Sequence, residues 1–406
     1  MNINKKVLTL GSFCLLMLCG CSSKEDDLTS SAQHDLIEPN PVKIELSSQA
    51  KELVSASTRA ALTGSEDMDI NGIGIFGLAR ERQTFYSDRD DIDALTKWTW
   101  NSESEDRSCI LYNVQSNKEG TDIVWNDQSA IYFYPITQVY AYDFYGYYPY
   151  VDPENDSDDD EIENDGATGK KVTAVYKIDG TRDLLWGRSN IPNDAGGVKP
   201  YCARWFRANA ANHASKPNIL LQHLLTRFVF SVVPGENYDD AEAYTEAVVM
   251  QVKDVRIKDV NNYVKVTIVD FDNQNLTIAE RIEVYGGTKE DFILKDENGD
   301  PISDHPVDVP DNPNNPTRVG ESIMLYPDTQ YKLQITLSLT SPNEFHNTER
   351  DFVTEVPLYL EPLEENNTFL PGCSYNVKIV VHGPREVELS STLQQWTVEE
   401  GPEIEL

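Results

Sequence analysis

Patterns that mark common enzyme and metal sites are missing from this sequence. No His-x-x-x-His pair that would hold zinc occurs among its histidines, which stand at positions 34, 213, 223, 305, 346 and 382. There is no Gly-x-Ser-x-Gly elbow for a serine nucleophile and no Cys-His signature. A glycosidase carboxylate pair is not readable among 68 acidic residues, because their spacing in the fold is not visible in the sequence. We therefore expect no catalytic residue, no metal and no cofactor.

Positive charge is also scarce. The chain has 34 basic residues against 68 acidic ones, which gives a formal net charge of −34. Such a surface repels phosphates, so nucleic acid is excluded as a partner. The hydrophobic content of 39% is nevertheless sufficient for real cores, and 406 residues are enough for two domains.

Long apolar runs are rare, and the one at the N-terminus is short. Val7 to Leu18 follows Lys5 and Lys6, and its 12 residues are too few to cross a bilayer as a helix. This arrangement predicts a signal peptide over residues 1–20. The run ends in Leu18-Cys19-Gly20-Cys21, which resembles the lipobox of bacterial lipoproteins, so Cys21 is the predicted lipidation site. The alternative is an ordinary signal peptide with an incidental cysteine.

Residues 21–40 are polar and predict a disordered acidic tether. Lys24 followed by Glu25, Asp26 and Asp27 resembles the signal that sends lipoproteins of Bacteroidetes to the outer cell surface. Once the signal is removed and Cys21 is acylated, Cys109, Cys202 and Cys373 remain. Three scattered cysteines allow at most one disulfide, so stability must come from packing.

Short segments of alternating or aromatic character follow, separated by turn residues. The first is Val42–Leu46. The others stand at 72–78, 122–125, 130–134, 139–150, 172–178, 183–186, 227–233, 252–257, 263–268, 322–326, 331–339, 351–360, 375–381 and 387–393. Only Leu220–Leu225 suggests a turn of helix. Many short strands at this spacing predict β-sandwiches. Two segments, 152–165 and 296–316, predict long loops outside the sheets.

Two motifs have weak functional readings. Gly72, Gly74 and Gly77 match a dinucleotide-binding pattern, but no amphipathic helix follows, so a glycine-rich buried strand is the better interpretation. The acidic run at 152–165 has carboxylates that suit calcium. It lacks the ligand spacing of a calcium loop, so a solvated loop is preferred.

Several segments together resemble the fimbrillins of Bacteroidetes, the pilin subunits of type V fimbriae. They are Tyr132–Pro135, Tyr142–Pro149, Asp183–Trp186, Leu221–Phe228 and Gly372–Trp396. The resemblance implies an all-β fold with two β-sandwich domains in tandem, of transthyretin-like, Greek-key type. We place these domains at residues 60–225 and 226–406. Tyr134 and Gly146 depart from the family pattern.

The resemblance also implies proteolytic processing. An arginine-specific protease would cut between Arg59 and Ala60 and remove a propeptide, residues 41–59, with the first strand. The alternative is an incidental arginine in a linker. Removing a strand leaves an open apolar groove and unpaired edge amides, which a strand from another subunit can fill.

The C-terminus supplies the candidate donor strand. Its apolar residues alternate with a phase change, which predicts a bulge or a break between two donated strands. The predicted donor residues are Val387, Leu389, Leu393, Trp396, Val398, Ile404 and Leu406.

These observations predict a non-enzymatic fimbrial subunit, carried to the outer membrane by lipid on Cys21 and then released into an extracellular fimbrium. Its expected partners are other fimbrial subunits, as a homopolymer or with tip proteins, and an adhesion ligand that the sequence does not identify. One alternative is a tip or accessory adhesin. Another is a surface glycan-binding lipoprotein that does not polymerise.

Overall fold

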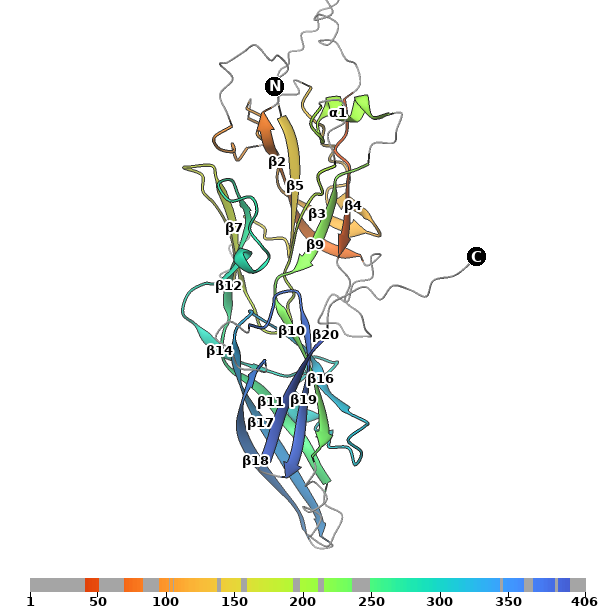
Figure 1. Cartoon of the computed structure of the whole chain (residues 1–406), viewed down its shortest axis with the longest axis vertical. Helices are drawn as coiled ribbons and strands as arrows, with labels where there is room; N and C mark the ends of the chain where they lie inside the picture. The colour runs from red at the N-terminus through yellow and green to blue at the C-terminus, as the bar shows by residue number, and fades with distance from the viewer. Residues whose placement is uncertain are drawn as a thin grey trace, which may run out of the picture. The chain divides into compact units, whose positions relative to one another are not determined.

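The computed structural model describes residues 41–50, 69–82, 95–101, 103–104, 106–136, 140–154, 159–192, 198–210, 215–235, 249–343, 346–360, 368–383 and 386–394. Most of these residues lie in β-strands and few lie in helices, which confirms the predicted all-β fold class (Figure 1).

Seven strands form a closed barrel in the order β1-β4-β3-β2-β5-β8-β9. They are β1 (Leu46–Ala50), β2 (Ile70–Arg82), β3 (Cys109–Glu119), β4 (Asp122–Trp125), β5 (Tyr140–Tyr148), β8 (Leu185–Arg188) and β9 (Asn218–His223). Their inward side chains, with the short helix α1 (Ala203–Ala208), form one hydrophobic core that includes Ile75, Phe144 and Trp205. The barrel therefore has its own apolar interior.

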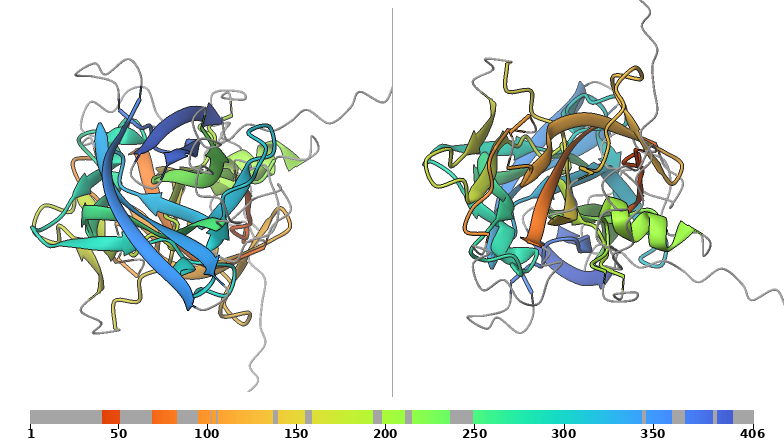
Figure 2. Two further views of the ribbon diagram at one scale, coloured as in Figure 1. Left: turned by 90° about the horizontal axis from the view of Figure 1, so that it is seen from below. Right: turned by 90° about the horizontal axis from the view of Figure 1, so that it is seen from above.

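The remaining strands form three open sheets, and Figure 2 shows the ribbon of the chain from below and from above. One sheet has the order β16-β10-β19-β20, with β10 (Thr226–Pro234), β16 (Thr317–Leu325), β19 (Ser374–Gly383) and β20 (Glu386–Gln394). The second has the order β14-β11-β17-β18, with β11 (Val249–Asn261), β14 (Lys289–Ile293), β17 (Gln330–Asn343), β18 (His346–Tyr359) and β15 (Val307–Asp308) beside β11. The third has the order β13-β12-β7-β6, with β6 (Asp160–Asn164), β7 (Lys171–Lys177), β12 (Tyr263–Asp270) and β13 (Ile282–Val284).

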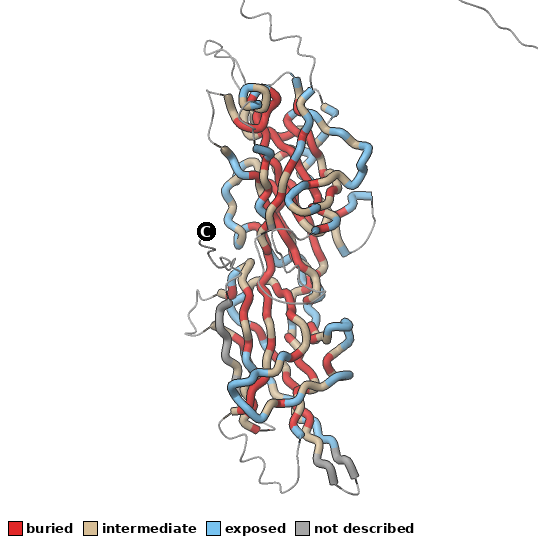
Figure 3. The backbone as a smooth tube through the Cα atoms, turned by 90° about the vertical axis from the view of Figure 1, so that its right-hand side faces the viewer, coloured by how far each residue is buried: buried red, intermediate tan, exposed pale blue. Residues whose placement is uncertain are grey.

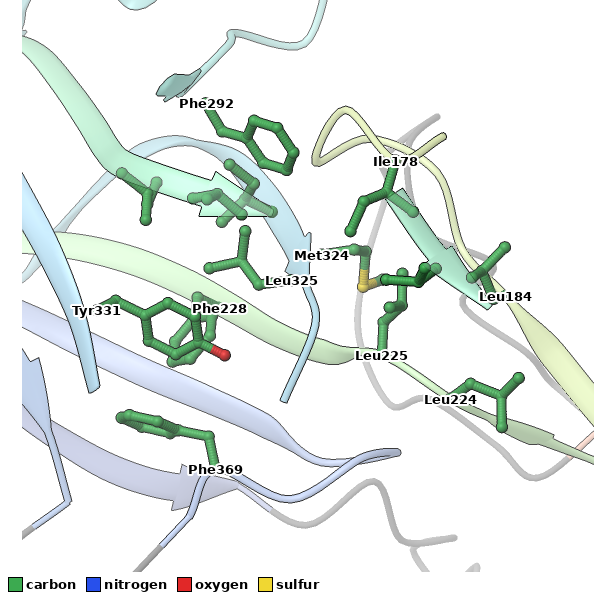
Figure 4. Close-up of a cluster of buried hydrophobic side chains, with 14 of the residues drawn as sticks. Ile178, Leu184, Leu224, Leu225, Phe228, Phe292, Met324, Leu325, Tyr331 and Phe369 are labelled. Atoms are coloured by element: carbon green, nitrogen blue, oxygen red, sulfur yellow. The ribbon is translucent and has the colours of Figure 1, made fainter. Parts of the chain in front are cut away.

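Alternation of apolar residues explains how these sheets pack. In β19, Tyr375, Val377, Ile379 and Val381 are buried, while the residues between them are not. Figure 3 shows buried residues along the strands and exposed residues mainly in the connections. The buried faces of β10, β11, β16, β17 and β19 share one large core. Figure 4 shows part of it, where Phe228, Tyr331 and Phe369 lie together and Leu225 lies beside Met324.

The glycine-rich segment is a strand, as interpreted from the sequence. Gly72, Gly74 and Gly77 all lie in β2. A Cβ atom at Gly74 would lie 2.0 Å from Cε1 of Tyr147. Tyr147 belongs to the neighbouring strand β5, and its ring packs over β2 at Gly74. The glycine therefore makes room for an aromatic ring rather than for a phosphate.

Several local predictions were wrong or incomplete. Leu220–Leu225 does not begin a helix, because residues 218–223 form β9 between β1 and β8. The predicted acidic loop contains β6, which pairs with β7. Glu163 on β6 accepts a hydrogen bond from Lys265 at 2.7 Å, so a neighbouring cation offsets part of its charge. The second predicted loop contributes the two-residue strand β15 to a sheet. Strands β3, β13 and β14 and helix α1 were not predicted, and the predicted strand at 130–134 forms only an isolated bridge between Phe133 and Lys43.

Other expectations concern individual side chains. His223 is buried, and its Nδ1 lies 2.7 Å from Oδ2 of Asp183, so it is a hydrogen-bonded structural histidine as interpreted. No disulfide joins Cys109, Cys202 and Cys373 to one another. Burial raises the pKa of the Cys109 thiol to about 12, which makes it an unreactive core residue.

Candidate functional site: the strand that closes the barrel

Strand β1 completes the barrel by bridging two strands that lie far apart in the sequence. It runs antiparallel to β4, with Leu46 opposite Ile123, and parallel to β9, with Ser47 opposite Asn218. In the order of the described strands, β1 alone stands between β4 and β9. Without it, both neighbours would become edges with unpaired backbone groups.

Backbone hydrogen bonds hold this segment on both sides. The Ser48 amide donates to Thr121 O at 2.9 Å, and the Ser47 amide donates to Pro217 O at 2.9 Å. Just before β1, the Ile44 amide donates to Tyr132 O at 2.9 Å. The chain from 42 to 50 is thus extended and paired, although the regular strand begins only at Leu46. The predicted strand at 42–46 therefore lies at the start of a longer paired segment.

Side chains of the segment alternate strictly between the core and the surface. Ile44, Leu46 and Ser48 are buried at 3%, 1% and 0% relative exposure, whereas Lys43 and Glu45 are exposed. Burying a large aliphatic side chain contributes roughly 1.5–3 kcal/mol, so Ile44 and Leu46 are the main apolar anchors. Ser48 is satisfied because its Oγ donates to Ile219 O at 3.0 Å.

The barrel surface under β1, which we call the β1 seat, consists of residues 121–125, 132–134 and 216–221. Trp125 and Tyr132 pack edge to face in it, with ring centroids 5.0 Å apart. Burial raises the pKa of Tyr134 well above its ordinary value, so its ring stays neutral in the core. The seat therefore presents apolar side chains between β4 and β9, whose backbone groups form hydrogen bonds with β1.

The side chain of Lys216 lies beside the seat. Lys216 Nζ lies 3.8 Å from Oε2 of Glu45 and 3.2 Å from Oδ1 of Asp122. All three side chains are more than two-fifths exposed, so each pair contributes only about 0–1 kcal/mol. Such contacts favour one register of a strand more than they hold it in place.

The predicted site residues fall partly within the described ranges. Val387 and Leu389 lie half-buried in β20, where they face Val381 and Ile379 of β19 across the antiparallel pair. Leu393 is also in β20, opposite Tyr375. The other predicted site residues lie outside the described residues; they are Cys21, Arg59, Ala60, Trp396, Val398, Ile404 and Leu406.

Only part of the β1 seat could be predicted from the sequence. The strand at 122–125 was predicted, but Lys216 and Ser48 were not singled out, and 220–225 was interpreted as helical. The residues that β9 buries, Ile219, Leu221 and His223, follow a two-residue period, but the exposed Leu220 between them hides this period in the sequence.

Within the described ranges, no three His, Cys, Asp or Glu side chains gather as a possible metal site. No helix in that part of the chain is long and apolar enough to span a bilayer.

Comparison with known proteins adds a family. A family model described as fimbrillin-like matches residues 58–396. Two solved structures, each described as a "putative cell adhesion protein", resemble the chain. The one from Bacteroides uniformis has 14% identity and a TM-score of 0.39, covering 87% of this chain and 99% of its own. The one from Bacteroides eggerthii has 10% identity and a TM-score of 0.36, covering 88% and 97%.

A fimbrial protein from Bacteroides ovatus is 11% identical, with a TM-score of 0.26 over 86% of this chain and 50% of that one. No curated protein matches the chain.

Proposed function

The chain belongs to the fimbrillin-like family, and from this premise we propose that it is a structural subunit of a fimbrium. It is exported as a precursor lipidated on Cys21, cut after Arg59, and polymerised when a strand of another subunit replaces β1.

One observation carries the proposal. The only described strand upstream of Arg59 is β1, and it is the strand that closes the barrel. A cut after Arg59 breaks the covalent link between β1 and the rest of the barrel, so hydrogen bonds and side-chain packing alone then hold it. Cleavage would therefore prepare the barrel to accept a strand of another subunit, which couples processing to assembly.

The energetics support exchange. Loss of β1 uncovers the seat of Ile44 and Leu46, worth roughly 3–6 kcal/mol of apolar burial. Each lost backbone hydrogen bond adds about 0.5–1.5 kcal/mol. An incoming strand recovers these contributions and must offset the loss of translational and rotational freedom. Because donor and seat lie on different surfaces of one subunit, the contacts are heterologous and extend into a fibre.

The first test concerns the processing site. Arg59→Ala should leave the precursor uncut, and β1 would then stay in its seat. We expect this variant to remain monomeric and membrane-bound, as measured by gel filtration, membrane fractionation and electron microscopy of cell surfaces. Arg350→Ala, at an exposed arginine of β18, is the matched control and should form normal fibres. Normal fibres from Arg59→Ala would rule out cleavage at this residue as the trigger.

The second test concerns the donor. A chain that ends at Arg385 lacks every predicted donor residue. After protease treatment it should accept a strand but donate none. Added in small amounts to processed full-length subunits, it should therefore shorten the fibres, which electron microscopy measures directly. Independent polymerisation of the truncated chain would contradict assembly through the C-terminus. Circular dichroism checks that its sheets have formed.

A further inference from the structure

A hollow with a volume of about 300 Å³ lies away from the β1 seat, since none of its lining residues belongs to β1, β4 or β9. Three segments line it: residues 179–181 between β7 and β8, residues 293–299 at the end of β14 and beyond it, and residues 321–323 of β16. We propose that this hollow binds the cationic side chain of a lysine on a basic partner protein. Its volume lies at the lower end for small-molecule pockets, so it suits a single side chain.

Backbone contacts fix the three segments relative to one another. The Met324 amide donates to Gly180 O at 2.7 Å, and the Glu321 amide donates to Lys295 O at 2.7 Å. Gly180 has a φ of +86°, and a Cβ atom there would lie 2.6 Å from Cγ1 of Ile323. Glycine therefore allows the first segment to pack this closely on β16. The hollow is thus preformed, which lowers the entropic cost of binding a ligand.

The lining has an excess of negative charge. Its charged residues are Asp179, Lys295, Asp296, Glu297 and Glu321. Arg318 offsets one carboxylate, because its guanidinium group lies 2.7 Å from Oε2 of Glu321, and three carboxylates then remain against one lysine. Such a lining repels an anionic ligand and attracts an ammonium group. In the described part of the chain, no three His, Cys, Asp or Glu side chains gather as a metal site, so an organic cation fits better than a metal ion.

Apolar side chains form another part of the lining. Leu294 and Ile323 are 1% and 3% exposed, and Ile293 is half-buried. The aliphatic stem of a lysine packs on such a surface while its ammonium group stays near the carboxylates. A ligand with an aliphatic stem and a cationic end therefore matches both parts of the lining.

The hydroxyl group of Ser322 gives an independent indication of a ligand. Ser322 lines the hollow and is 4% exposed, but its Oγ has no hydrogen-bond partner among the described residues. A buried hydroxyl without a partner destabilises a fold, and the large majority of buried polar side chains have one. An ammonium group has three donors, so it can serve Ser322 Oγ and the carboxylates together. Binding would satisfy a group that the fold leaves unpaired.

The overall charge of the chain indicates the kind of partner. With a formal net charge of −34, the chain attracts a basic protein over a long range and repels proteins as acidic as itself. A basic partner therefore encounters the hollow more often than a second copy does. Added salt weakens this attraction, whereas the contacts inside the hollow select for the lysine side chain.

Removing the Ser322 hydroxyl should change binding and stability in opposite directions. The probe is Nα-acetyl-lysine methylamide, titrated into the full chain by calorimetry. Ser322→Ala should bind it about 10-fold more weakly, because a hydrogen bond to a charged group is lost. Its denaturant midpoint should stay the same or rise, because an unpaired buried hydroxyl is gone. Ser116→Ala is the matched control: its buried Oγ donates to Ile73 O at 3.2 Å, so this variant should lose stability and keep its binding.

A charge variant tests the location of the site without altering the core. Glu297 is exposed, so Glu297→Lys should fold normally. It should bind the probe at least about 5-fold more weakly, because a like charge then stands in the lining. Glu161→Lys, the same change at an exposed position of β6, is the control and should bind like the wild type. Equal binding by the two variants would place the probe elsewhere and overturn the proposal.

Other compounds test the chemistry of the ligand. Nα-acetyl-norleucine methylamide has an aliphatic stem without the ammonium group and should show no saturable binding. Equal binding of the norleucine and lysine compounds, or no saturable binding of the lysine compound, would overturn the proposal. Tighter binding of methyl glucoside would assign the hollow to a sugar instead. Unchanged binding by Ser322→Ala, or a loss of stability like that of Ser116→Ala, would equally contradict the role of the hydroxyl and with it the proposal.

Discussion

Leu46→Asp is expected to release β1 from the barrel while the open sheets stay folded. Leu46 is 1% exposed and belongs to the barrel core opposite Ile123. Removing a buried leucine side chain costs roughly 2–5 kcal/mol, and an unpaired carboxylate in its place adds a desolvation penalty. The chain avoids this penalty by leaving β1 out of the barrel. β1 lies near the N-terminal end of the described residues, so its release does not require another strand to unfold.

Amide hydrogen exchange of the purified precursor measures this effect. Exchange within residues 42–50 should accelerate roughly 30-fold to several thousand-fold, which corresponds to 2–5 kcal/mol. Exchange within β10 should change little, because that strand pairs with β16 and β19 rather than with β1. Glu45→Gln, one residue away and exposed, is the control and should behave like the wild type. Retained protection at residues 47 and 48 in Leu46→Asp would mean that the seat tolerates charge.

Asp143→Ala is expected to destabilise the chain by about 3–5 kcal/mol, the usual consequence of breaking a buried ion pair from one side. The Asp143 side chain, in β5, is 2% exposed. Its Oδ1 accepts from Arg80 at 2.7 Å, and its Oδ2 accepts from Arg188. Removing the carboxylate leaves two guanidinium groups, only 14% and 18% exposed, without their shared counterion.

Denaturant unfolding at neutral pH measures the loss as a lower midpoint with an unchanged slope. The control is Asp272→Ala, since Asp272 pairs with Lys170 at 3.0 Å but is 65% exposed. Its removal should cost about 0–1 kcal/mol. Similar losses of stability in the two variants would mean that the buried ion pairs of Asp143 contribute no more to stability than the exposed pair of Asp272.

Local alternation was sufficient to predict much of the fold. The segment at 42–46, the glycine-rich strand β2 and the C-terminal pair β19 and β20 follow a two-residue period that the sequence displays directly. Strand β9 was misinterpreted because Leu220, Leu221, Leu224 and Leu225 also fit one face of a helix. Pairing with β1 and β8 decides in favour of a strand, and this tertiary context is not contained in the local pattern.

The site was harder to predict for a related reason. Its walls come from residues near 123 and 219, and no local pattern relates them to each other or to Leu46. Strand β6 was missed because its acidic residues resemble a solvated loop, although Lys265 and Arg182 bind Glu163 and Asp160 there. Pairings between distant segments, rather than residue types, define both places.

The parallel pairing of β1 with β9 also sets an order of events during synthesis. Ser47 and Asn218 are separated by 171 positions. At about 5–20 residues per second, the ribosome makes the second strand roughly 10–30 seconds after the first. Strand β1 therefore has no β9 partner until nearly the whole barrel has been made. The first described strand of the barrel thus acquires its second neighbour only when β9, the last barrel strand in the sequence, has been made.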